Sequence, residues 1–142
     1  MEFGNRPLTP AQQFACLQSN PICFGRGTLN SRGLKWSFEA RPSALSRAYA
    51  ARIEFSIGRW PIVFIDSPDL NTLSGGTKLP HVYSQCPVQL CLYLPGSGEW
   101  RPSMRLDQAF VPWTYLWLEF FEAWLCDGVW RGGGVHPGEQ AA

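Results

Sequence analysis

Cysteine and histidine are the side chains of this sequence that could carry covalent or acid–base chemistry. There are five cysteines and two histidines. His81 and Cys91 both fall in the segment PHVYSQCPVQLCLYLPGSGEW (80–100), where a strand-like apolar run ends at a Pro-Gly-Ser-Gly loop. A cysteine at the end of a strand is a candidate nucleophile, because a thiolate attacks acyl carbons. A free cysteine among apolar residues is also commonly a small buried residue, and a lone histidine is commonly structural, so both interpretations stay open here.

The other cysteines are expected to be less reactive. Cys16 should lie on the inner face of a first helix and Cys126 at the end of a last helix, both in structural roles. Cys23 and Cys86 are expected in loops, where exposure would make Cys86 the rival nucleophile. No CxxC pair occurs and only two histidines are present, so the sequence predicts no metal site and indicates no cofactor.

Composition excludes several classes of protein. The net charge is +1 and no basic block occurs, which argues against a partner nucleic acid. The longest apolar stretch, 110–126, contains Glu119 and Glu122, so no membrane span is predicted. The odd number of cysteines and an N-terminus without an apolar signal region indicate a cytoplasmic protein with reduced thiols.

The elements that must position these residues can be predicted from their patterns. Thr9, Pro10 and Gln12 form a capping box that begins a helix, and Pro21 ends it. Strands are predicted at 36–40, 49–57, 62–65 and 88–94, with loops at 20–33 and 66–80. A second helix is predicted at 112–126 and should end at Gly128. This order indicates an α+β fold with helices packed against one antiparallel sheet.

The second predicted helix carries a wide apolar stripe, which we interpret as a core face packed on the sheet. Its members recur at helical spacing: Trp113, Leu116, Trp117, Phe120, Phe121, Trp124 and Leu125.

The order of motifs around Cys91 resembles that of the ubiquitin-conjugating (E2) enzymes. Their active-site stretch runs from His-Pro-Asn to Ile-Cys-Leu, then to a Trp-Ser-Pro segment and a helix. Here HVY (81–83), LCL (90–92) and EWRPSMRL (99–106) take those places, and RWPIVFIDSP (59–68) resembles the segment entering the third strand of the family. The resemblance covers roughly 9–126. It implies an E2 (UBC)-like fold, with a four-stranded meander, an N-terminal helix and a helix after the active-site loop.

The resemblance also implies a division of the chain. Residues 1–130 would be a single E2-like catalytic domain and 131–142 a Gly-rich C-terminal tail. The segment RGGG (131–134) is interpreted as a flexible stretch after the helix rather than as a ubiquitin-like terminus, because further residues follow it.

One departure from the family pattern narrows the resemblance. Val82 and Tyr83 replace the Pro-Asn of the motif, which puts the usual ligation to lysine in doubt. A trimmed E2 core with an altered motif is similar to the bacterial E2-like proteins of antiviral operons, in particular the cyclic-oligonucleotide (CBASS) systems. That similarity implies a partner, the C-terminal tail of a cGAS-like nucleotidyltransferase, and allows an E1-like enzyme as a second partner.

The family pattern implies roles for individual residues. Cys91 would accept the acyl group, and His81 would shape the loop beside it. Tyr83 stands where the motif asparagine would be and would contact the thioester oxygen. Gly96, Ser97 and Gly98 would form a flexible rim along which the partner tail threads. Trp100 would pack that rim onto the core, unless it is an ordinary core residue.

Three hypotheses for the function follow. The first is an active E2-like acyl carrier that holds or conjugates the C-terminus of the nucleotidyltransferase. The second is a non-catalytic E2-like binding module in which Cys91 is incidental. The third is the E2 of a bacterial ubiquitin-like conjugation operon, against which the altered motif counts. Replacement of Cys91 by alanine would abolish the function in the first case and leave binding intact in the second.

Overall fold

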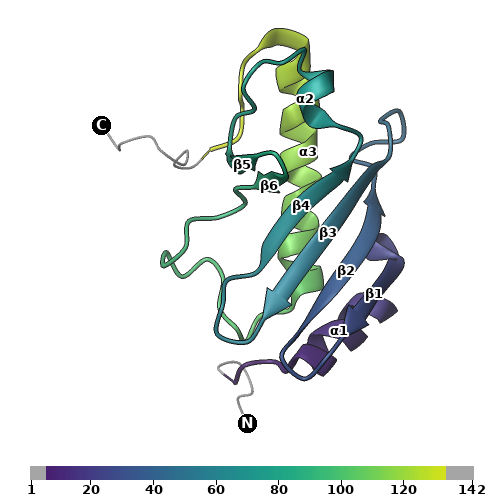
Figure 1. Cartoon of the computed structure of the whole chain (residues 1–142), viewed down its shortest axis with the longest axis vertical. Helices are drawn as coiled ribbons and strands as arrows, with labels where there is room; N and C mark the ends of the chain where they lie inside the picture. Colours follow the sequence, from purple (N-terminus) through teal and green to yellow (C-terminus); the bar gives the residue numbers. More distant parts are fainter. Residues whose placement is uncertain (1–5, 134–142) are drawn as a thin grey trace.

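The computed structural model describes residues 6–133, which fold into one antiparallel sheet with helices on one side (Figure 1). The sheet is six-stranded, in the order β1-β2-β3-β4-β6-β5. The elements are α1 (Pro10–Ser19), η1 (Pro21–Cys23), β1 (Gly25–Leu29), β2 (Gly33–Ala40), β3 (Tyr49–Ser56), β4 (Ile62–Ser67), α2 (Leu70–Leu73), β5 (Val82–Gln85), β6 (Val88–Leu90), η2 (Leu106–Gln108) and α3 (Phe110–Asp127). Figure 1 shows α3 crossing behind the sheet and α1 beside β1, so the predicted α+β class is confirmed.

The two central strands follow the predicted alternation. In β2 and β3 every second side chain is buried, and the strands pair in register, with Trp36 opposite Ile53 and Phe38 opposite Ala51. The buried side chains of this face meet α1 and α3, for example where the Phe14 ring meets the edge of Trp36 at 5.3 Å and the Tyr49 ring meets Phe121 at 6.4 Å. The core therefore lies between one face of the sheet and the two long helices.

The predicted four-stranded meander is wrong at both edges of the sheet. β1 lies within 20–33, which was expected to be a loop. The strand was not predicted because its sequence, GRGTL, has no apolar alternation, and its side chains are mostly exposed. The strand predicted at 88–94 is confined to Val88–Leu90, and β6 pairs between β4 and the short strand β5. The predicted loop 66–80 contains the short helix α2. Edge strands lack a second neighbour, so their sequences need not carry a strong strand pattern.

Both predicted long helices are confirmed. Thr9 and Gln12 form the capping box of α1 through reciprocal hydrogen bonds of 2.8 and 3.1 Å. Gly128, in the left-handed region at φ 75°, ends α3. Within residues 6–133, neither of these helices nor any other is long and apolar enough to cross a bilayer.

The buried face of α3 differs from the predicted stripe. Of the stripe, Trp117 and Phe121 are buried, whereas Trp113 and Phe120 are partly exposed and Leu116 is 47% exposed. The face against the core is rotated toward the other side of the helix and comprises Phe110, Val111, Thr114, Trp117, Leu118 and Phe121. The predicted stripe therefore combines part of the core face with a neighbouring apolar face that is partly exposed.

Gln13 joins α1 to the segment that leads into α3. Its side chain is fully buried, its Nε2 donates to the carbonyl of Met104 at 2.8 Å, and its Oε1 accepts from the amide of Leu106 at 2.8 Å. Buried backbone groups need such partners, because their hydrogen bonds to water are lost on folding. Gln13 thus fixes the approach of the chain to η2 and α3.

We predict that Gln13→Ala lowers the free energy of unfolding by about 2–4 kcal/mol, since it leaves two buried backbone groups without partners. Urea denaturation of the two proteins measures the difference. Gln18→Ala, at an exposed position of the same helix, is the matched control and should change stability little. Equal losses for the two variants would contradict the prediction.

Candidate functional site

Cys91 lies directly after β6 and is anchored through its backbone to His81. The Cys91 amide donates to the carbonyl of His81 at 3.0 Å. The same carbonyl accepts a second hydrogen bond, at 2.9 Å, from the indole Nε1 of Trp117 on α3. One carbonyl group therefore holds together the cysteine, the turn before β5 and the long helix.

His81 takes an unusual backbone conformation to present that carbonyl. Its φ is 48°, in the left-handed region that residues other than glycine rarely adopt. The imidazole stacks on the indole of Trp130, with ring centroids 5.0 Å apart and planes 18° from parallel. The His81 main chain thus makes the hydrogen bond to the Cys91 backbone, while the ring faces the segment that follows α3.

Tyr83 reaches the cysteine because β5 contains a bulge. Val82 pairs with Leu90 and Ser84 with Gln89, which leaves Tyr83 as the extra residue between them. Bulges redirect side chains, and they are frequent near active sites. The Tyr83 hydroxyl donates to the carbonyl of Tyr93 at 3.1 Å and is also a hydrogen-bond partner of the Cys91 thiol. The residue at the place of the motif asparagine therefore contacts the candidate nucleophile.

The surroundings of Cys91 keep its thiol protonated. Burial raises the pKa of Cys91, the hydrogen bond from Tyr83 lowers it, and the negative charge of Glu99 raises it, with a net increase above the ordinary cysteine value. The sulfur lies 4.0 Å from the Tyr93 carbonyl oxygen, which can accept from a thiol but cannot stabilise a thiolate. Cys91 is therefore a weak nucleophile at neutral pH. It would react readily only with an acyl group that is already activated.

The loop after Cys91 is organised by Glu99. The Glu99 carboxylate accepts from the Ser97 hydroxyl at 3.0 Å and from the Leu94 amide at 3.3 Å. Gly96 and Gly98 have φ near 85°, which suits glycine. These contacts give the predicted rim a defined conformation.

Trp100 follows the rim and lies in the core. Its side chain is buried, and its ring meets that of Phe110 edge to face at 5.0 Å. This position agrees with either role considered for it, as a support of the rim or as an ordinary core residue.

A groove of about 220 Å³ adjoins Cys91. It lies between the end of β6, the outward flank of α3 and the chain after α3, and it is lined by His81, Cys91, Leu92, Trp113, Leu116, Trp117, Phe120, Trp130, Gly132 and Gly133. The α3 residues of this lining belong to the stripe that was predicted to be a core face. Their position at the groove was not predicted. The signal was the width of the stripe, which exceeds what one core face needs. Gly96, Ser97, Gly98 and Trp100 are not part of this lining.

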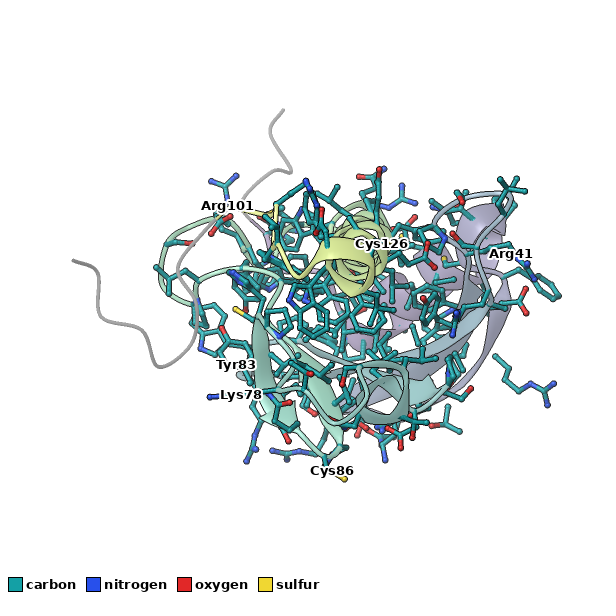
Figure 2. All side chains as sticks on the ribbon, turned by 90° about the horizontal axis from the view of Figure 1, so that it is seen from above. Arg41, Lys78, Tyr83, Cys86, Arg101 and Cys126 are labelled. Carbon is teal, nitrogen blue, oxygen red and sulfur yellow. The ribbon has the colours of Figure 1, made fainter. Side chains whose placement is uncertain are left out.

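The remaining cysteines lie elsewhere. Cys23, expected in a loop where it could be exposed, lies in η1 and is fully buried, and burial raises its pKa to about 11. Cys86 is exposed as predicted, at the turn between β5 and β6, and Cys126 is exposed near the end of α3. Figure 2 shows Cys86 and Cys126 well apart from Tyr83. In the part of the chain that the structure describes, no three histidine, cysteine, aspartate or glutamate side chains are placed to hold a metal ion.

Comparison with known proteins gives the family. No curated protein matches the sequence. The family described as Type II CBASS E2 protein matches residues 13–137, a range that includes the sheet, Cys91, α3 and the segment after it. An N-terminal helix, an antiparallel sheet and a long C-terminal helix are consistent with the UBC-like fold expected of such a protein. The match confirms the resemblance to the E2-like proteins of CBASS operons, and the chain belongs to the type II CBASS E2 family, whose operons serve anti-phage defence.

Proposed function

We propose that this protein is a cysteine acyl carrier that forms a thioester between Cys91 and the C-terminus of a partner protein, a cGAS-like nucleotidyltransferase, and thereby regulates CBASS signalling. In this proposal, residues 1–130 act as the catalytic domain. The observation that carries it is the placement of Cys91 at the mouth of an apolar groove, next to Tyr83 and with its backbone fixed by His81.

The proposed step is a thioester exchange or its equivalent. The Cys91 thiolate attacks the carbonyl carbon of an activated donor, R–C(=O)–X, where X is the thiol of an E1-like enzyme or the phosphate of an acyl adenylate. The new C–S bond forms, the C–X bond breaks, and X leaves with the electron pair. The thiol proton passes to solvent or to the departing thiolate. The donor supplies the activation, so the carrier needs no strong base of its own.

The electrostatics of Cys91 support a carrier rather than a hydrolase. Burial and Glu99 raise its pKa, and among residues 6–133 no cationic side chain lowers it. Enzymes that attack unactivated amides lower the pKa of the cysteine with a paired histidine or a helix N-terminus. A thiolate of high pKa is also a poor leaving group, so a thioester on Cys91 would be slow to transfer its acyl group again.

Tyr83 would act on the charged species. A hydroxyl has one proton to donate, and it can go to the Tyr93 carbonyl, to a thiolate on Cys91 or to the thioester oxygen. His81 would hold the cysteine segment through its carbonyl. Gly96, Ser97 and Gly98 would contact parts of the partner tail that lie beyond the groove, and Trp100 would support this rim from the core.

The position of Val82 counts against ligation to lysine by the route of typical E2 enzymes. Its side chain is 5% exposed and packs into the core, and Tyr83 carries a hydroxyl in place of an amide. Asn71 and Asn20 donate elsewhere, to the carbonyl of Gln85 at 2.7 Å and to the carboxylate of Asp107 at 2.9 Å. The ubiquitin-like operon therefore has less support than the nucleotidyltransferase partner.

We predict that Cys91 carries an adduct of the partner when the protein is produced together with its operon neighbours. Intact mass spectrometry should show the mass of the partner minus one water on the wild type, and a thiol reductant should remove it. Cys91→Ser should give an adduct that resists the reductant, because an oxygen ester replaces the thioester, or none. Cys86→Ala, which changes an exposed cysteine at another site, should behave as the wild type.

Two outcomes would contradict the acyl carrier. One is an adduct that persists on Cys91→Ala. The other is a wild type without any adduct that retains the partner as well as Cys91→Ala does, which would establish the binding module instead.

We predict that Tyr83→Phe makes Cys91 slower to react at neutral pH. The tyrosine hydrogen bond lowers the pKa of the Cys91 thiol, so loss of this bond raises the pKa further. At a pH below the pKa, a smaller fraction of Cys91 is then thiolate. In both proteins the rate of alkylation by iodoacetamide should rise with pH through the ordinary cysteine range. At pH 7 the variant should be about three- to tenfold slower, the effect of one partly exposed hydrogen bond to a charged group.

The matched control for this experiment is Tyr115→Phe. The Tyr115 hydroxyl donates to the carbonyl of Ile22 at 2.8 Å and does not affect the pKa of Cys91. Its pH profile should equal that of the wild type. Superimposable profiles for Tyr83→Phe and the wild type would remove Tyr83 from the site.

A further inference from the structure

The chain after α3 turns back onto the groove beside Cys91. Gly128 reverses its direction, and the turn is held by Asp127, which accepts from the Val129 amide at 2.9 Å and pairs with the guanidinium of Arg131. Figure 1 shows this segment running from the end of α3 toward β5 and β6. Residues 130–133, called the C-terminal strap below, form one wall of the groove.

Trp130 seats the strap on three aromatic partners. Its ring lies 5.0 Å from His81, 5.5 Å from Trp117 and 5.8 Å from Phe120, measured between centroids. Two of these partners, His81 and Trp117, are also the pair whose hydrogen bond fixes the Cys91 segment. The strap is thus packed on the same residues that position the cysteine.

The seat of Gly132 accepts backbone but not a side chain. A Cβ at this position would come within 2.7 Å of Trp130 Nε1 and 2.8 Å of the Phe120 ring. A Cβ at Gly133 would meet nothing within 4 Å. A glycine backbone therefore fills this part of the groove, and the next residue is not constrained in the same way.

The closed strap leaves one polar group unsatisfied. Trp130 Nε1 is buried and has no hydrogen-bond acceptor among residues 6–133. A buried N–H without an acceptor is unfavourable, and a peptide carbonyl placed there would remove that penalty. The covering residue, Gly132, offers the indole its Cα and no acceptor.

We propose that the C-terminal strap is an intramolecular competitor of the partner tail: Gly132 holds part of the groove beside Cys91, and the tail must displace it to reach the sulfur. The proposal rests on the acyl-carrier function proposed above, since it assumes that a peptide C-terminus enters this groove. Trp130 stays on His81 when Gly132 leaves, and its N–H then donates to a backbone carbonyl of the incoming tail. The exchange replaces the backbone of the strap by the backbone of the partner tail, and it gives the Trp130 N–H an acceptor.

Two glycine variants of the full chain separate the strap from other effects. Gly132→Ala adds a methyl group that the closed seat cannot hold, whereas Gly133→Ala adds the same group in open space. The first readout is the alkylation rate of Cys91 by iodoacetamide relative to that of exposed Cys86 in the same molecule, measured by peptide mass spectrometry. This ratio should rise at least threefold in Gly132→Ala and stay at the wild-type value in Gly133→Ala. An unchanged or lower ratio in Gly132→Ala overturns the proposal.

The second readout is charging of Cys91 by the partner in the presence of the other operon proteins. The partner concentration for half-maximal charging should fall at least threefold in Gly132→Ala and not in Gly133→Ala. If all three proteins charge at the same partner concentration, the competitor proposal fails and the acyl carrier stands. If none is charged while Gly132→Ala still raises the alkylation ratio, the acyl carrier fails and the covering of Cys91 by the strap stands.

Discussion

The carbonyl group of His81 is the point on which the arrangement around Cys91 depends. A carbonyl oxygen has two lone pairs, and here one accepts from the Cys91 amide and the other from Trp117 Nε1. The first bond extends the pairing of β5 and β6 past the end of the strand, and the second attaches that edge to α3. The left-handed backbone of His81 turns the carbonyl toward both donors. Strain at one residue is thereby offset by two hydrogen bonds that also define the groove.

A second constraint acts one residue further along. In a regular strand, burial of Val82 on one face would determine the direction of the next side chain, Tyr83. The bulge in β5 removes this restriction. The tyrosine can then keep its backbone in the sheet edge and its hydroxyl at the cysteine. Tyr83, which takes the place of the motif asparagine in the sequence, thus brings a hydroxyl beside Cys91. This is why Tyr83 reaches Cys91 despite its different length.

The sequence predicted what local pattern determines and failed where partners far along the chain decide. The capping box, the alternation of β2 and β3 and the stop at Gly128 are local, and all were confirmed. β1 carries no apolar pattern, because it gains its place by pairing with β2 alone. Cys23 was expected in a loop where it could be exposed, yet its carbonyl accepts from the indole of Trp36 on β2 and its side chain is buried beneath α1. At the site, the motif identified Cys91 and its neighbours, but the groove required the three-dimensional path of the strap.

A thiol of raised pKa has a further consequence for a carrier. In the proposed carrier, the same burial that would slow capture of an acyl group would also make Cys91 a poor leaving group, so capture would depend on an activated donor and release on a positioned acceptor. Trp113, Trp117 and Phe120 line the groove with apolar surface, which offers a hydrolytic water few hydrogen-bond partners. A site with these properties favours retention of its cargo over turnover. The proposed competitor strap would add a second barrier on the entry side, so that a tail would enter only when its own contacts exceed those of Gly132.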